Sequence, residues 1–125
     1  MANPLQHDEG GLTLTVANTD SLGEQIQRAF PDARVVKALN TMNCQVMAHP
    51  GRVPGDHVVF TCGEDAEAKA TVAALLSGIG WPDERIIDLG GIREARGTEA
   101  WLLLWLPLMR AAGTADFNVS VQRAG

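Results

Sequence analysis

Short apolar runs alternate with amphipathic stretches along most of this chain. The apolar runs lie at residues 34–39, 57–62 and 85–89, and each is followed by a glycine or a polar residue. Runs of this length with few charges predict strands that are covered on both faces of a sheet. Strand and helix patterns that alternate with short turns predict an α/β fold with a mostly parallel sheet of three to four strands.

Amphipathic spacing predicts flanking helices around these strands. Ser21 and Glu24 have the spacing of a capping box at the start of the first helix, and Pro31 is expected to end it. A second helix is predicted over residues 65–78, directly after the strand at 57–62. This pair forms one β-α step.

The last helix is predicted over residues 92–112, and its second half is apolar nearly all round. The stretch WLLLWLPLM contains Pro107, which is expected to bend the helix. A small domain has little interior in which to bury such a long apolar C-terminal helix. We therefore expect a homodimer through Trp101, Trp105 and Leu108, or docking on another part of the same fold.

The remaining segments carry weaker patterns. The alternating residues 12–16 and 118–122 predict short edge strands, and residues 43–47 predict a helical turn. Residues 40–56 form a long connection with two prolines and two glycines. Such a connection is typical of a functional loop or of a poorly ordered one.

Composition narrows the class of protein. With 125 residues and 46% hydrophobic content, the chain can bury one core, and residues 1–125 are expected to form a single domain. A net charge of −5 disfavours nucleic-acid binding, which needs a basic face. No leader pattern opens the sequence and no apolar run approaches the roughly 20 residues that span a bilayer, so we expect a cytoplasmic protein without a membrane segment.

Motifs that hold phosphate groups are absent from these residues. The dinucleotide fingerprint G-x-G-x-x-G needs three glycines between a strand and a helix, whereas Gly78-Ile79-Gly80 follows a helix and has Asp83 at the third position. Neither Lys37 nor Lys69 follows a glycine, as the P-loop would require. The chain encodes no phosphate cradle of either kind.

Other candidate chemistry stays open at this stage. Cys44 could pair with His49 or His57 as a thiol and imidazole, which would suit a thiol hydrolase. The two histidines with Asp56 between them form a weak candidate metal cluster. The alternative interpretation is that the histidines have solvated or structural roles and that Cys44 and Cys62 are reduced thiols.

Charges early in the last helix have two readings. Arg93 and Arg96 are spaced to share one helix face, which suits either an anion-binding pair or ordinary salt bridges. Glu94 and Glu99 are acids near the amino end of the predicted helix, where they complement its dipole.

Several segments together carry a resemblance to a known family. They are NPL near the start, SLGEQIQRAFPDARVVKALNTMN, HVVFTCGEDAEAK, IIDLGGIREARGTE and the closing FNV. Over nearly its whole length the sequence resembles the NADP-dependent oxidoreductases of the coenzyme F-420 (deazaflavin) reductase family. The resemblance implies a partial Rossmann-like fold, in which residues 1–125 are the C-terminal half and the N-terminal dinucleotide-binding half is missing.

The resemblance also implies a site and its cofactors, NADP(H) and coenzyme F-420. The residues that fall on the family's cofactor-binding segments are Asn3, Pro4, Asn40, Thr41, Met42, Asn43, Cys44, Phe117 and Asn118. A histidine stands at the place of Asn40 in the archaeal deazaflavin reductases, so the hydride partner is left open. A catalytic acid or base is not required, because the cofactors carry the chemistry of hydride transfer.

Two functions therefore stand side by side. The first is hydride transfer between NADPH and a deazaflavin or related acceptor, by a truncated enzyme that lacks the phosphate-binding fingerprint. The second is a non-catalytic dimerising remnant or interaction module of the same fold. In the second case, the polar residues Asn40 and Thr41 only cap the end of the strand at 34–39.

Overall fold

The computed structural model describes residues 1–125, and a three-stranded sheet lies at its centre. Its strand order is β3 (Lys37–Ala38), β4 (Val59–Cys62) and β5 (Ile86–Asp88). The pair β4 and β5 is parallel, as predicted, but β3 and β4 are antiparallel. The sheet is therefore mixed, and the prediction of a mostly parallel sheet is corrected.

The first predicted strand is shorter than its apolar run because the backbone on both sides of β3 does not continue the pairing with β4. The Val35 N–H donates to Gln27 Oε1 at 3.2 Å instead of to a neighbouring strand. Leu39 has a φ of 66°, a left-handed conformation that is uncommon for a branched residue and that turns the chain out of the sheet. Only Lys37–Ala38 remain paired, so the predicted strand at 34–39 is reduced to two residues.

The connection from β3 to β4 explains the antiparallel pairing. It holds only α2 (Cys44–Ala48) and a short 3-10 helix at Pro50–Arg52, with no long crossover helix. Parallel neighbours need a crossover that carries the chain back along the sheet. Here the chain re-enters the sheet in the opposite direction. The helical turn predicted at residues 43–47 is confirmed as α2.

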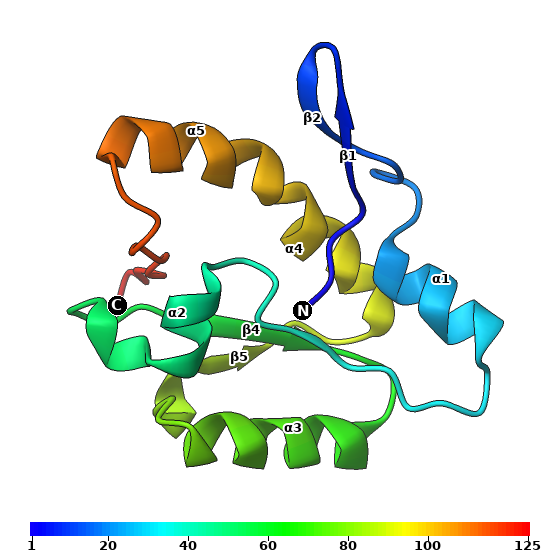
Figure 1. The fold of residues 1–125 in the computed structure, drawn as a ribbon. Helices are drawn as coiled ribbons and strands as arrows, with labels where there is room; N and C mark the ends of the chain where they lie inside the picture. Colours follow the sequence, from blue (N-terminus) through cyan, green and yellow to red (C-terminus); the bar gives the residue numbers. More distant parts are fainter.

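Helices cover both faces of the sheet (Figure 1). The helix α3 (Ala66–Gly78) lies on one side, whereas α4 (Ala95–Ala100) and α5 (Leu102–Ala112) lie on the other. Asp65 caps α3 by accepting a bond from the Ala68 N–H at 2.7 Å. A 3-10 turn at Asp83–Arg85 then leads into β5.

The first helix, α1 (Leu22–Ala29), begins at the predicted capping box. Ser21 Oγ accepts a hydrogen bond from the Glu24 N–H at 3.1 Å and donates one to Glu24 Oε2 at 2.7 Å. The helix ends at Ala29, two residues before Pro31. Both predicted ends are confirmed because the capping interactions are local.

The last predicted helix is divided into three pieces. A 3-10 turn at Ile92–Glu94 leads into α4, and Trp101 separates α4 from α5. Pro107 lies inside α5, and the interruption at Trp101 comes before it in the sequence. It falls just after Gly97 and Thr98, a weak helix former and a residue whose hydroxyl donates back to the Ala95 carbonyl at 3.3 Å.

The edge strands predicted near the two ends of the chain have different outcomes. The short edge strand predicted at residues 12–16 is found as β2 (Gly11–Leu14), which pairs with β1 (Leu5–Asp8) in an antiparallel hairpin that projects from the body (Figure 1). Residues 118–122 form no strand. Their backbone pairing with the sheet region is limited to a bridge between His57 and Ser120, with the Val58 N–H donating to the Val119 carbonyl at 2.9 Å.

One apolar cluster forms the centre of the core. Its members are Met42, Val46, Val59, Leu76 and Trp81. The Trp81 indole is 1% exposed and donates to the Met47 carbonyl at 3.1 Å, so its polar atom is satisfied inside the cluster. This cluster ties α2 and α3 to the sheet.

Candidate functional site

Two asparagine side chains meet at the end of β3. Asn3 Nδ2 donates to the Asn40 carbonyl at 2.9 Å, and Asn40 Nδ2 donates to Asn3 Oδ1 at 3.0 Å. These residues are 37 positions apart in the sequence, and Asn40 is 3% exposed. Each amide nitrogen carries two hydrogens and uses one here, so the pair keeps donor capacity for a further group. We call Asn3 and Asn40 the amide pair.

The residues on either side of the amide pair are enclosed. Pro4 is buried next to Asn3, and Thr41 and Met42 are 3% and 6% exposed. The Thr41 carbonyl accepts a bond from Trp101 Nε1 at 3.0 Å, whereas the Thr41 hydroxyl has no hydrogen-bond partner. Met42 belongs to the core cluster, which directs it away from the polar groups.

The next two residues have other surroundings. Asn43 Oδ1 accepts a bond from the Gln45 N–H at 2.8 Å, so this side chain caps α2. Cys44 is a free and exposed thiol. The segment from Asn40 to Cys44 therefore divides between a buried polar end and an exposed helix start.

The predicted residues near the carboxyl end pack against other parts of the chain. Phe117 stacks on Trp105, with ring centroids 5.3 Å apart and an angle of 25° between the planes. Asn118 Nδ2 lies 2.9 Å from both the Val58 carbonyl and His57 Nδ1. Trp105 Nε1 and Asn118 Oδ1 are buried without a partner, which marks this corner as polar and enclosed.

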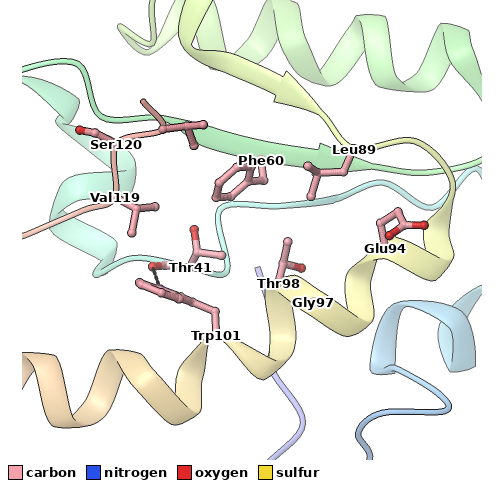
Figure 2. Close-up of a pocket in the computed structure, with 10 residues that line it drawn as sticks. Thr41, Phe60, Leu89, Glu94, Gly97, Thr98, Trp101, Val119 and Ser120 are labelled. Atoms are coloured by element: carbon pink, nitrogen blue, oxygen red, sulfur yellow. Dashed lines mark hydrogen bonds between the residues drawn. The ribbon is translucent and has the colours of Figure 1, made fainter. Parts of the chain in front are cut away.

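A cavity of about 500 Å³ lies between the sheet and α4 (Figure 2). Phe60 and Leu89 line it from the sheet side, Trp101 from the junction of α4 and α5, and Val119 from the chain end. Of the nine predicted site residues, only Thr41 lines this cavity. The structure thus separates two regions, the amide pair and the cavity.

The residues that line the cavity were not predicted from the sequence, although the spacing of four of them along one helix indicated a shared face. Glu94, Gly97, Thr98 and Trp101 line the cavity and have the i, i+3, i+4, i+7 spacing of one helix face. The sheet residues that complete the cavity have no such signal, because they come from separate strands.

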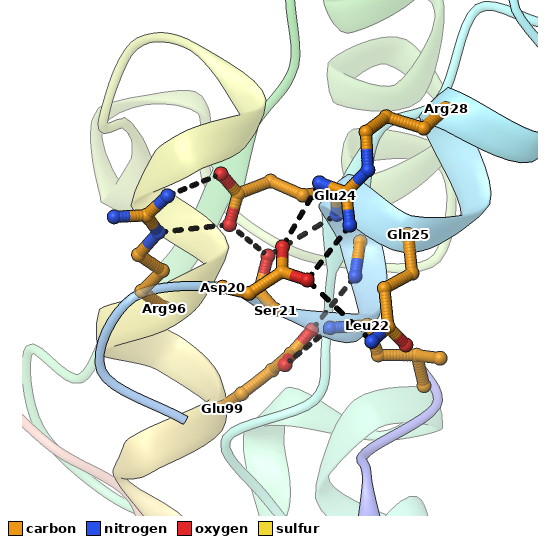
Figure 3. Close-up of polar contacts among 9 residues, drawn as sticks. Asp20, Ser21, Leu22, Glu24, Gln25, Arg28, Arg96 and Glu99 are labelled. Carbon is orange, nitrogen blue, oxygen red and sulfur yellow. Dashed lines mark hydrogen bonds and ion pairs between the residues drawn. The ribbon is translucent and has the colours of Figure 1, made fainter. Parts of the chain in front are cut away.

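Charged side chains hold α1 against α4 (Figure 3). Glu99 Oε1 and Oε2 accept bonds from the Gly23 and Leu22 N–H groups at 3.0 and 2.8 Å, which gives the amino end of α1 a carboxylate partner. Arg96 binds both carboxylate oxygens of Glu24, at 2.9 and 2.8 Å, and this pairing lowers the pKa of Glu24. Of the two interpretations of Arg96, the structure supports the salt bridge. Glu99 complements the dipole of α1 and not, as predicted, that of its own helix.

The arrangement of the side chains supports neither the pairing of Cys44 with His57 nor a metal site. The His57 ring is buried, with Nε2 3.0 Å from the Pro50 carbonyl and Nδ1 2.9 Å from Asn118, so both ring nitrogens are occupied by groups other than a thiol. No three His, Cys, Asp or Glu side chains are arranged to hold a metal ion. None of the helices has the length and apolar character needed to cross a membrane.

The chain is a mixed α/β protein with the amide pair at the end of a strand and a cavity between sheet and helix. Its fold matches that of a Rossmann-like reductase of known structure.

A crystal structure from Arthrobacter sp. FB24, provisionally described as an F-420-dependent NADP-reductase, superimposes on the chain with a TM-score of 0.92 and 54% sequence identity. The match covers 97% of this chain and 55% of that one. The metalloreductase STEAP3 of Rattus norvegicus is 33% identical over 87 residues, which are 70% of this chain and 17% of that protein. No protein-family model matches the chain.

The chain thus spans about half the length of the solved structure and a smaller part of the metalloreductase. Both similar proteins are described as reductases.

Proposed function

We propose that this chain provides the nicotinamide-facing wall of an NADP-dependent oxidoreductase, in which hydride passes between NADPH and a deazaflavin such as coenzyme F-420, or a related acceptor. The observation that carries the proposal is the amide pair. It brings together Asn3 and Asn40, which the family resemblance assigns to two separate segments bordering the nicotinamide. The 54% identity to the solved reductase supports the assignment.

The amide pair suits the carboxamide of a nicotinamide. When bound, NADPH would supply a hydride ion, which is a proton with two electrons, and the acceptor would take up this hydride together with a proton from solvent. The residues of this chain orient the ring, since the free amide hydrogens of Asn3 and Asn40 can donate to its carboxamide oxygen. The buried neighbours Pro4 and Thr41 keep water away from that place.

These residues contain no glycine motif that would hold the phosphates of NADPH. The chain has no glycine fingerprint, and the buried Lys37 is engaged by Glu99 at 2.8 Å. Arg96, the cation of α4, forms an ion pair with Glu24. We therefore infer that this chain alone holds the nicotinamide end and adds little affinity from the adenosine end.

A comparison of two ligands tests the proposal. NADPH and reduced nicotinamide mononucleotide are each titrated into the chain while the side-chain amide resonances of Asn3 and Asn40 are followed by NMR. We expect both ligands to shift these resonances, with affinities within roughly threefold of each other because the phosphate cradle is lacking. Asn40→Ala should abolish the shifts at Asn3, whereas Gln45→Ala, an exposed change on α2, should leave them intact.

Two results would contradict the proposal. If neither ligand shifts the amide pair at roughly 10 mM, the chain does not present a nicotinamide wall. If NADPH binds far more tightly than the mononucleotide, the chain also recognises the adenosine end, and the inference of little affinity from that end is wrong.

The second candidate function is an interaction module that dimerises through α5. The observation that favours it is an exposed apolar face, on which Leu103, Leu104 and Leu108 are 56%, 52% and 37% exposed. Trp101 and Trp105, which we also expect in such an interface, are half-buried and make contacts within the chain, and the leucines are the more exposed groups of this face.

Light scattering distinguishes this candidate. Leu104→Glu should convert a dimer into a monomer, whereas Leu75→Glu, at a leucine that is 66% exposed on α3, should leave the mass unchanged. A wild-type chain that is monomeric at every concentration would exclude dimerisation through α5.

A further inference from the structure

The cavity between the sheet and α4 has the size and walls of a small-molecule site. Its volume of about 500 Å³ lies within the range of ligand pockets, roughly 300–1,000 Å³. Five of its ten lining residues are hydrophobic, and Phe60 and Trp101 supply aromatic rings (Figure 2). The Trp101 indole N–H is already bonded to the Thr41 carbonyl, which holds this ring in place.

The polar groups of the cavity are few and leave room for a partner. Glu94 is the only charged residue of the lining, it is exposed, and its carboxylate takes part in none of the ion pairs of the chain. The Thr41 hydroxyl belongs to the same lining and is buried without a hydrogen bond. Since an unsatisfied buried hydroxyl costs about 1–3 kcal/mol, a hydrogen-bonding group brought into the cavity would be favoured.

We propose that this cavity binds a small molecule with a flat apolar ring and a cationic amine at one end. The ring lies between Phe60, Leu89 and Trp101, and the amine faces the carboxylate of Glu94. Aromatic walls and an acidic group together favour a cation over an anion. The site does not depend on the nicotinamide proposal, because the amide pair does not line the cavity.

Gly97 gives a direct way to close the cavity. It lines the cavity from α4, and a Cβ atom added there meets no atom within 4 Å. Gly97→Leu therefore adds a side chain at the wall of the cavity without a clash at its Cβ, and leucine is a better helix former than glycine. Gly78 is a matched control, because it also lies in a helix, has no atom within 4 Å of an added Cβ and does not line the cavity.

The test uses two probes that share a ring and differ in charge. 1-Naphthylmethylamine and 1-naphthoate are titrated into the chain, and binding is followed by calorimetry and by the backbone NMR resonances of Thr98 and Val119. We expect the amine to bind at least about tenfold more tightly than the carboxylate. Glu94→Gln should reduce this preference to about threefold or less, because it removes the charge and retains the shape.

The glycine variants decide whether the cavity is the site. Gly97→Leu should weaken amine binding at least about tenfold, and Gly78→Leu should bind as the wild type does. The proposal is overturned if Gly97→Leu binds the amine unchanged, if both glycine variants lose binding equally, or if the naphthoate binds as tightly as the amine. Near-ultraviolet circular dichroism of each variant establishes that the fold is retained, and Glu94→Gln provides an independent test should Gly97→Leu fail to fold.

Discussion

Lys37 Nζ lies 2.8 Å from Glu99 Oε1, and the two side chains are 6% and 2% exposed. The same ammonium group donates to the Ala2 carbonyl, and Glu99 also accepts from two N–H groups of α1. This ion pair therefore connects the segment before β1, the strand β3 and the helices α1 and α4. Because Ala2 precedes Asn3, it also holds the first member of the amide pair near β3.

Removing one partner of this pair should be costly. We expect Lys37→Met to lower the free energy of unfolding by about 3–5 kcal/mol, because the carboxylate of Glu99 would stay buried without its cation. Urea unfolding followed by circular dichroism measures the change.

An exposed cation provides the control for this experiment. Arg34 pairs with Asp65 and Glu67 at 3.6 and 3.4 Å, and its side chain is 62% exposed. Arg34→Met should cost at most about 1 kcal/mol. Equal losses for the two methionine variants would show that burial of the Lys37 and Glu99 pair has no energetic consequence.

The capping box at α1 gives a second prediction. Ser21→Ala removes the acceptor of the Glu24 N–H and should destabilise the fold by about 1 kcal/mol. Ser21→Gly also loses the side-chain bond to Glu24 Oε2, and its cost should exceed that loss by only about a few tenths of a kcal/mol. Unfolding in urea compares the two variants with Ser120→Ala, a change of an exposed serine. A Ser21→Ala variant as stable as Ser120→Ala would argue against the cap.

The acid limb of stability should depend on Asp20. Hydrogen bonds from Arg28 at 3.0 and 2.7 Å lower the pKa of this carboxyl to about 2. In the unfolded chain the pKa is about 3.9, so the contribution is present above about pH 4 and is lost as the pH falls towards 2. Arg28→Gln should return the pKa towards its ordinary value, which carboxyl carbon shifts in an NMR titration would reveal. An unchanged pKa in this variant would rule out Arg28 as the cause.

The two thiols should differ in reactivity. Burial raises the pKa of the Cys62 thiol to about 11, whereas Cys44 is exposed. The folded pKa lies above the ordinary value of about 8.5, so the stability from the neutral buried thiol is full below about pH 8.5 and is lost as the pH rises towards 11. At about pH 8, iodoacetamide should label Cys44 within minutes and leave Cys62 unmodified, as mass spectrometry can measure.

Single-thiol variants separate these two reactions. Cys62→Ser should label at the wild-type rate of Cys44, and Cys44→Ser should label only in urea or at high pH. Rapid labelling of folded Cys44→Ser at about pH 8 would show that Cys62 is accessible.

Local patterns predicted α1, α2, α3 and two of the sheet strands. Ser21 and Glu24 lie three residues apart and form their contacts within one helical turn, so their spacing alone predicted the start of α1. The strands β4 and β5 likewise follow from continuous apolar runs, which need burial wherever they lie in the sheet.

The tertiary structure decided the direction of β3 and the composition of the site. Periodicity reports that a strand is buried and says nothing of the direction in which its neighbour runs, so the antiparallel pairing with β4 was not predicted. The resemblance placed Asn3 and Asn40 in one site, but only the fold supplies the reciprocal bonds between them.

The sequence by itself determined an acidic α/β chain without a phosphate cradle, because these properties depend on composition and on neighbouring residues. Only the tertiary structure decided that Lys37 and Glu99 share a buried ion pair and that Thr41, Phe60 and Trp101 face one cavity. Such contacts join residues dozens of positions apart, and their distances are set by how the sheet and helices pack.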